Sequence, residues 1–120
     1  MNKPSVRLRV AGVRECFNLI SKMLPPRNLA ELSAVVSYSA RCVRALIPVI
    51  EKDEKLSAML EVVLGAPVRD YFESCVREAE SISDPSESLS RKFDCAWNVI
   101  VTLLAITPEE EEEGRRRIAK

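Results

Sequence analysis

Apolar side chains recur along the chain at steps of three and four residues, which is the period of an amphipathic helix. The first such stretch runs from Pro4 or Ser5 to Leu24. A proline is tolerated in the first turn of a helix, and the pair at residues 25 and 26 stops it. One face of this helix is therefore expected to lie in the core. Its apolar stripe is Val6, Val10, Val13, Phe17, Ile20 and Leu24.

The same helix carries a second apolar surface. Leu8, Leu19 and Met23 lie on nearly the opposite side from the stripe, beside Gly12. A 120-residue chain has too few elements to cover both sides of this helix by itself. We therefore expect the helix to be covered on two sides, one of them by another subunit.

Three further helices are predicted between residues 28 and 83. Asn28 is a residue type that caps helix starts, and Pro48 is expected to kink or end the second helix near residue 47. Asp53 then caps a shorter helix that Gly65 closes, and Pro67 opens a fourth. The residues expected to face inward are Leu29, Leu32, Val36, Val43, Ile47 and Ile50 in the second helix, Leu56, Met59, Leu60 and Val63 in the third, and Val68, Tyr71, Phe72, Cys75, Val76 and Ala79 in the fourth.

The fifth helix has the clearest start signal. In the stretch DPSE, Asp84 is a cap, Pro85 is a first-turn residue and Glu87 is placed as in a capping box. The second half of this helix is apolar nearly all round, so it is expected to be central or to lie in an interface. The residues that make its apolar surface are Leu89, Phe93, Ala96, Trp97, Ile100 and Leu104, widened by Val99, Val101 and Leu103.

The chain ends in TPEEEEEGRRRIAK, which repeats the order of cap, proline and early acid. Three glutamate–arginine pairs at spacing i,i+4 favour a short helix, although the stretch has almost no apolar face and is frayed unless a neighbour holds it. We therefore predict an all-α, single-domain bundle of five helices over residues 1–106, followed by a charged C-terminal helix or tail over residues 107–120. Its core is expected to include Phe17, Leu60, Phe72, Phe93 and Trp97.

Composition agrees with one helical domain and excludes most chemistry. The chain has 120 residues, 47% of them hydrophobic, with three glycines and no histidine. Without histidine, a CxxC pair or a glycine-rich phosphate loop, we predict no catalytic residue, no metal site and no cofactor. The four cysteines, at positions 16, 42, 75 and 95, are expected to be buried thiols; two disulfides in an oxidising compartment are the alternative.

Hydropathy gives no expectation of a membrane protein. The longest uncharged run, residues 95–108, is 14 residues long, whereas about 20 are needed to span a bilayer. Arg7, Arg9 and Arg14 interrupt any apolar stretch near the N-terminus, so no secretory signal is expected. We predict no membrane span and a location in a virion or in the cytoplasm.

Charge is divided along the chain although its formal net value is zero. Residues 1–27 carry six basic side chains and one acidic one, whereas residues 49–90 carry ten acidic and four basic ones. A basic end of this kind favours contact with a polyanion, here the phosphate backbone of double-stranded DNA without sequence reading. The predicted DNA-binding residues are Lys3, Arg7, Arg9, Arg14, Lys22, Arg41 and Arg44.

Self-association is the second prediction, with a copy of the chain or a paralogous subunit as partner. It rests on the second apolar surface of the first helix and on the apolar second half of the fifth. Arginine outnumbers lysine twelve to six and glutamine is absent, a bias that also favours a thermophilic source. The predicted interface residues are Leu8, Leu19, Met23, Val99, Val101 and Leu103.

The stretch LSAMLEVVLGAPVRDY, residues 56–71, resembles a pattern in the helical major capsid proteins of rod-shaped and filamentous viruses of hyperthermophilic archaea. The shared pattern is an apolar helix that ends in Leu-Gly-small-Pro, and it covers about sixteen of 120 residues. The resemblance implies a small helical protein that pairs into dimers and wraps double-stranded DNA in an A-like form. It also implies N-terminal helical arms against the phosphates, whereas no long irregular arm precedes the first helix here.

Two other functional classes fit the same features. A small helical subunit of a larger nucleoprotein complex, such as a CRISPR effector, would share the basic face and the lack of catalytic groups. A protein-only helical adaptor would instead use the apolar half of the fifth helix and the charged tail to dock a partner.

Overall fold

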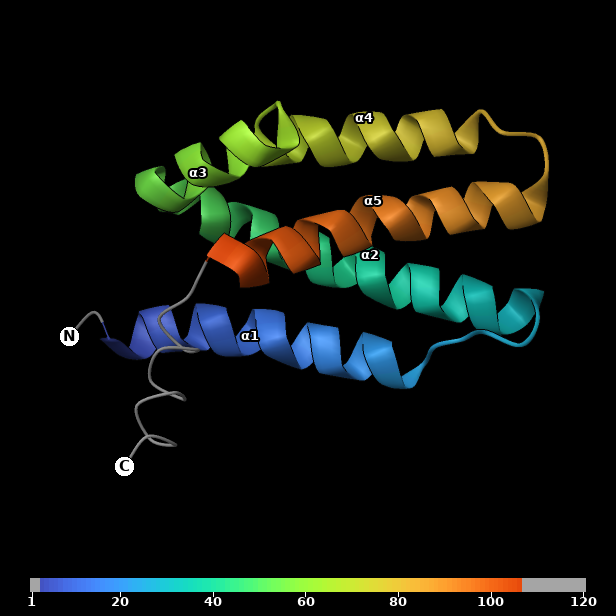
Figure 1. The fold of residues 1–120 in the computed structure, drawn as a ribbon, viewed down its shortest axis with the longest axis horizontal. Helices are drawn as coiled ribbons and strands as arrows, with labels where there is room; N and C mark the ends of the chain where they lie inside the picture. The colour runs from blue at the N-terminus through green and yellow to red at the C-terminus, as the bar shows by residue number, and fades with distance from the viewer. Residues whose placement is uncertain (1–2, 107–120) are drawn as a thin grey trace.

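The computed structural model of this chain describes the backbone of residues 3–106 and the side chains of residues 12–106. That part consists of helices and connecting turns with no strand, so the all-α, single-domain prediction is confirmed (Figure 1). The predicted C-terminal helix or tail at residues 107–120 lies outside the described residues. The helices are α1 Lys3–Lys22, α2 Leu29–Lys52, α3 Glu54–Leu64, α4 Val68–Glu80 and α5 Pro85–Ile106.

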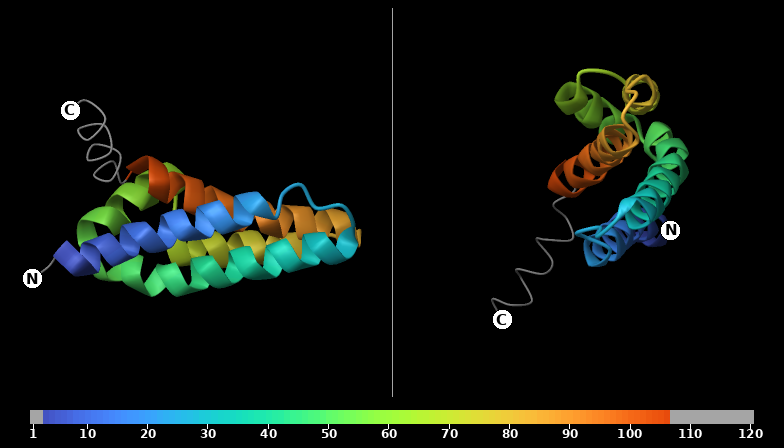
Figure 2. Two further views of the ribbon diagram at one scale, coloured as in Figure 1. Left: turned by 90° about the horizontal axis from the view of Figure 1, so that it is seen from below. Right: turned by 90° about the vertical axis from the view of Figure 1, so that its right-hand side faces the viewer.

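The helices form an elongated antiparallel bundle. α1 runs along the bundle, α2 returns beside it, α3 continues from α2 at an angle, and α4 and α5 form a second antiparallel pair (Figure 1). The described part measures 50 × 29 × 21 Å. α5 packs against each of the other four helices, so the prediction that its apolar half is central is confirmed (Figure 2).

The predicted caps account for most helix boundaries. The side chains of Asn28 and Asp53 accept hydrogen bonds from the backbone N–H groups of the third residue after each, at 2.9 and 3.1 Å. Asp84 does the same for the N–H of Glu87, at 2.9 Å. Gly65 ends α3 with a φ of 83°, a left-handed conformation that glycine adopts without the steric cost of a Cβ atom.

The expectation that Pro48 ends the second helix is wrong. α2 continues through it to Lys52, because Pro48 lies on the exposed side while Ile47 and Ile50 are buried on the other. The proline removes one hydrogen bond to the carbonyl of Arg44. Water can solvate a carbonyl on the exposed side, whereas ending the helix would withdraw Ile50 from the core.

The core is built around α5. Cys95, Ala96, Val99, Ile100 and Leu103 are all buried there. Of the five predicted core residues, Phe72 and Leu60 are buried, while Phe17, Phe93 and Trp97 lie partly buried at its edge.

These three aromatic rings pack on one another at the contact between α1 and α5. Trp97 stacks with Phe17 at 5.1 Å between ring centroids and with Phe93 at 5.4 Å. Phe17 belongs to α1 and the other two rings to α5. The stack therefore attaches α1 to the central helix.

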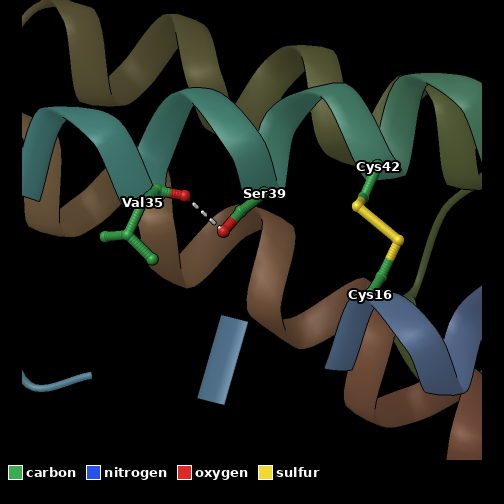
Figure 3. Close-up of a disulfide and its surroundings, with 4 residues drawn as sticks. All are labelled: Cys16, Val35, Ser39 and Cys42. Atoms are coloured by element: carbon green, nitrogen blue, oxygen red, sulfur yellow. Dashed lines mark hydrogen bonds between the residues drawn. A yellow bond between two sulfur atoms is a disulfide. The ribbon is translucent and has the colours of Figure 1, made fainter. Parts of the chain in front are cut away.

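The expectation of buried thiols is also wrong, because the four cysteines form two disulfides. Cys16–Cys42 joins α1 to α2 with 6.3 Å between Cα atoms, and Cys75–Cys95 joins α4 to α5 with 5.8 Å (Figure 3). Each antiparallel pair brings its cysteines to bonding distance. Near the first bond, the buried hydroxyl of Ser39 donates a 2.6 Å hydrogen bond to the carbonyl of Val35, which satisfies it inside the core.

Candidate nucleic-acid and subunit contacts

The predicted DNA-binding residues divide into those that the structure places and those that it does not. Lys3, Arg7 and Arg9 belong to α1, but their side chains lie outside the described residues. Of the remaining four, Lys22, Arg41 and Arg44 are exposed and Arg14 is half-buried.

Arg41 and Arg44 come together on the outer face of α2. Three residues apart on a helix, they are neighbours on its surface, and both are exposed. They are also the only charged residues between Glu31 and Glu51 along the chain. This face therefore presents two guanidinium groups with no carboxylate within α2 close enough to pair with them.

Arg44 is held in place by the fourth helix. Its guanidinium carbon lies 5.6 Å from the centroid of the Phe72 ring, within the distance of a cation–π contact. This contact uses the flat face of the guanidinium, which leaves the N–H groups at its edge directed away from the ring. Phe72 thus orients Arg44 without consuming its hydrogen-bond donors.

Arg14 does not join this pair. The Cys16–Cys42 disulfide marks the sides of α1 and α2 that face each other. Arg14 precedes Cys16 by two residues and Arg44 follows Cys42 by two, so each lies about 200° around its own helix from that contact. The two arginines therefore point away from each other on opposite sides of the α1–α2 pair.

The predicted interface set needs a correction. Val99 and Leu103 are 0% and 1% exposed within a single chain, because α5 is surrounded by the other helices, and they cannot contribute to a surface contact. Val101 is half-buried. Leu19 and Met23 are 39% and 37% exposed, in keeping with an uncovered second side of α1. The side chain of Leu8 lies outside the described residues.

The most exposed apolar surface is one that the sequence pattern assigned in part to the core. Met59, Val62 and Val63 on α3 are 42%, 83% and 59% exposed. Met59 and Val63 were predicted to face inward, which is wrong: Leu60 fills that role, with Leu56 and Leu64 partly buried beside it. α3 is therefore apolar on two sides, as α1 was predicted to be. We call Met59, Val62 and Val63 the α3 patch.

A second exposed apolar group lies where α1 ends and α2 begins. Leu29, the first residue of α2, is 51% exposed and joins Leu19 and Met23. We call these three residues the hairpin patch. It lies at the end of the bundle formed by the α1–α2 connection, whereas α3 lies at the opposite end (Figures 1 and 2).

The acidic middle of the chain contributes one well-formed ion pair. The guanidinium of Arg69 on α4 donates two hydrogen bonds, of 2.9 and 2.8 Å, to the two carboxylate oxygens of Glu51 on α2. The hydrogen bonds from Arg69 lower the pKa of the Glu51 carboxyl below its usual range. Because both groups are exposed and paired, we assign them a role in joining α2 to α4 rather than in binding.

Metal and membrane binding received separate attention. Among the described residues, no group of three or more cysteine, aspartate or glutamate side chains could hold a metal ion. α2 is long and apolar enough to cross a membrane by length and composition alone, a test that core helices of soluble proteins also pass. Eight of its residues are buried in this bundle. The expectation of no membrane span stays a prediction.

No protein-family model, curated protein or solved structure matches this chain. Function is therefore argued from the surfaces described above.

Proposed function

We propose that this chain is a non-enzymatic structural protein that self-associates and coats double-stranded DNA without reading its sequence, as a virion nucleoprotein does. The α3 patch is the observation that carries the self-association. Val62 at 83% exposure and Val63 at 59% are adjacent β-branched side chains on a short helix that is also apolar on its inner side. A helix that is apolar nearly all round is normally buried, so α3 requires a cover that the monomer does not provide.

Contact with DNA is supported by the paired arginines of α2. Arg41 and Arg44 are exposed, adjacent and free of carboxylates on their own helix, and Arg44 is oriented by Phe72. The residues beside them on this face, Ser37, Ala45 and Pro48, are small, so a phosphate backbone can approach the helix closely. Guanidinium groups suit phosphate geometry and carry no base preference in such contacts.

Replacing both arginines, Arg41→Ala with Arg44→Ala, is expected to weaken binding to double-stranded DNA by roughly ten-fold or more at low salt. Because two phosphate contacts are lost, the slope of log K against log salt should become less negative by about 1.8. Fluorescence anisotropy with two unrelated DNA duplexes, over a series of salt concentrations, measures both quantities. The two duplexes should give the same result.

The matched control is Arg77→Ala with Arg91→Ala, which removes the same charge from exposed positions on α4 and α5. If only net charge matters, this control will weaken binding equally, and the α2 face will not be the DNA site. Wild-type protein that fails to bind either duplex at low salt would remove DNA from the proposal.

A protein-only adaptor is the second candidate, and the α3 patch favours it as well. Such an adaptor would dock its partner on Met59, Val62 and Val63 and would be indifferent to DNA. Wild-type protein that stays monomeric in sedimentation velocity at high concentration, both with and without DNA, would exclude the coat and leave the adaptor.

A further inference from the structure

We propose that copies of this chain join head to tail, with the α3 patch of one copy seated on the hairpin patch of the next. The inference rests on the self-association proposed above and adds which surfaces meet. Its occupant is a second copy of this chain, and its contact is heterologous, meaning that two different surfaces of the protein form it.

The placement of the two patches is the first argument. The α3 patch and the hairpin patch lie at opposite ends of a bundle that is 50 Å long (Figures 1 and 2). A contact between unlike patches at opposite ends leaves one patch of each kind free on the growing assembly. Such contacts propagate in one direction, as rings if the rotation closes and as open filaments if it does not.

The composition of the patches is the second argument. Each supplies three apolar side chains of moderate size, and together they are the six large hydrophobic residues that the described part of the chain exposes. They therefore fall into two groups of three, one at each end, and are not scattered over the surface. Met59 and Met23, one in each patch, are unbranched side chains that adapt their shape to a partner surface.

Charge around the patches is the third argument. Two exposed glutamates, Glu54 and Glu61, and one lysine, Lys55, belong to α3. Lys22 lies within the hairpin patch, between Leu19 and Met23 in sequence, and is exposed. A contact between unlike patches brings acidic side chains toward a basic one, whereas pairing α3 with α3 brings two acidic rims together.

Two double variants separate this arrangement from a symmetric dimer. Val62→Glu with Val63→Glu places two charges in the α3 patch, and Met23→Glu with Leu29→Glu places two in the hairpin patch. All four positions are at least 37% exposed, and Met23 and Leu29 lie at helix ends, so each variant is expected to fold. Far-UV circular dichroism checks this, and Ser83→Glu with Ser86→Glu, at exposed positions outside both patches, is the charge-matched control.

Sedimentation velocity of each variant alone and of the two mixed in equal amounts is the test. Each patch variant alone should be monomeric, while the control should assemble as the wild type does. The mixture should give a dimer of one copy of each and nothing larger, because only one pair of intact unlike patches remains. A variant that misfolds is replaced by the single change Val62→Glu or Leu29→Glu, at the most exposed position of each patch.

The other outcomes are distinct. If the hairpin variant alone forms a dimer and the α3 variant does not, the contact is α3 with α3 and head-to-tail joining is wrong, although self-association stands. If the mixture stays monomeric while the wild type assembles, other surfaces form the contact and the inference fails. If the wild type itself is monomeric with and without DNA, it is the proposed function that fails.

Discussion

Removal of both disulfides is expected to lower the free energy of unfolding by about 6 kcal/mol, about 3 from each bond. The bonds close loops of similar length, with sequence separations of 26 and 20 residues. Because the entropy lost by the unfolded chain depends on the logarithm of loop length, the two contributions should differ by only about 0.2 kcal/mol. For a protein of ordinary stability, about 5–15 kcal/mol, this loss brings the fold close to its limit.

Urea titration of the oxidised protein, and of protein treated with a dithiol, measures the combined effect. The pairs Cys16→Ala with Cys42→Ala and Cys75→Ala with Cys95→Ala measure each bond separately. Alanine is preferred to serine because Cys95 is completely buried, where a new hydroxyl would lack a partner. A combined loss below about 1 kcal/mol would mean that the disulfides do not constrain the unfolded chain of this protein.

Phe72→Ala is expected to cost about 3–5 kcal/mol of stability, the next largest effect. Phe72 is 1% exposed and belongs to the buried face of α4, where its removal leaves a cavity that the surrounding helices can only partly fill. The same change removes the ring that orients Arg44. It should therefore also weaken DNA binding at temperatures at which the variant is still folded.

The matched control is Val62→Ala on the α3 patch, which is expected to change monomer stability by less than about 0.5 kcal/mol because Val62 is 83% exposed. Denaturant titration at a concentration where the wild type is monomeric compares the two variants. Phe72→Leu, which retains most of the volume, separates the cavity from the loss of the ring. A cost under about 1 kcal/mol for Phe72→Ala would show that α4 does not pack on the core through this residue.

The sequence by itself determined the helices and most of their ends. Periodicity of three and four residues is a local property, and so are the hydrogen bonds by which Asn28, Asp53 and Asp84 cap helix starts and the left-handed turn that Gly65 permits. It also determined that Phe72 and Leu60 lie in the core and that α5 is central, because their apolar surroundings repeat over several turns. These features depend on residues within about one helical turn of one another.

The tertiary structure alone decided which helix faces meet. Pro48 stays within α2 because Ile50 beyond it is buried, and the cysteines pair because two antiparallel helix pairs align them. The same alignment turns Arg14 away from Arg41 and Arg44, buries Val99 and Leu103, and leaves Met59 and Val63 exposed. The physical reason is that an α-helix with apolar residues on two sides can turn either side inward. Only the packing energy of the whole bundle selects which side is left for a partner.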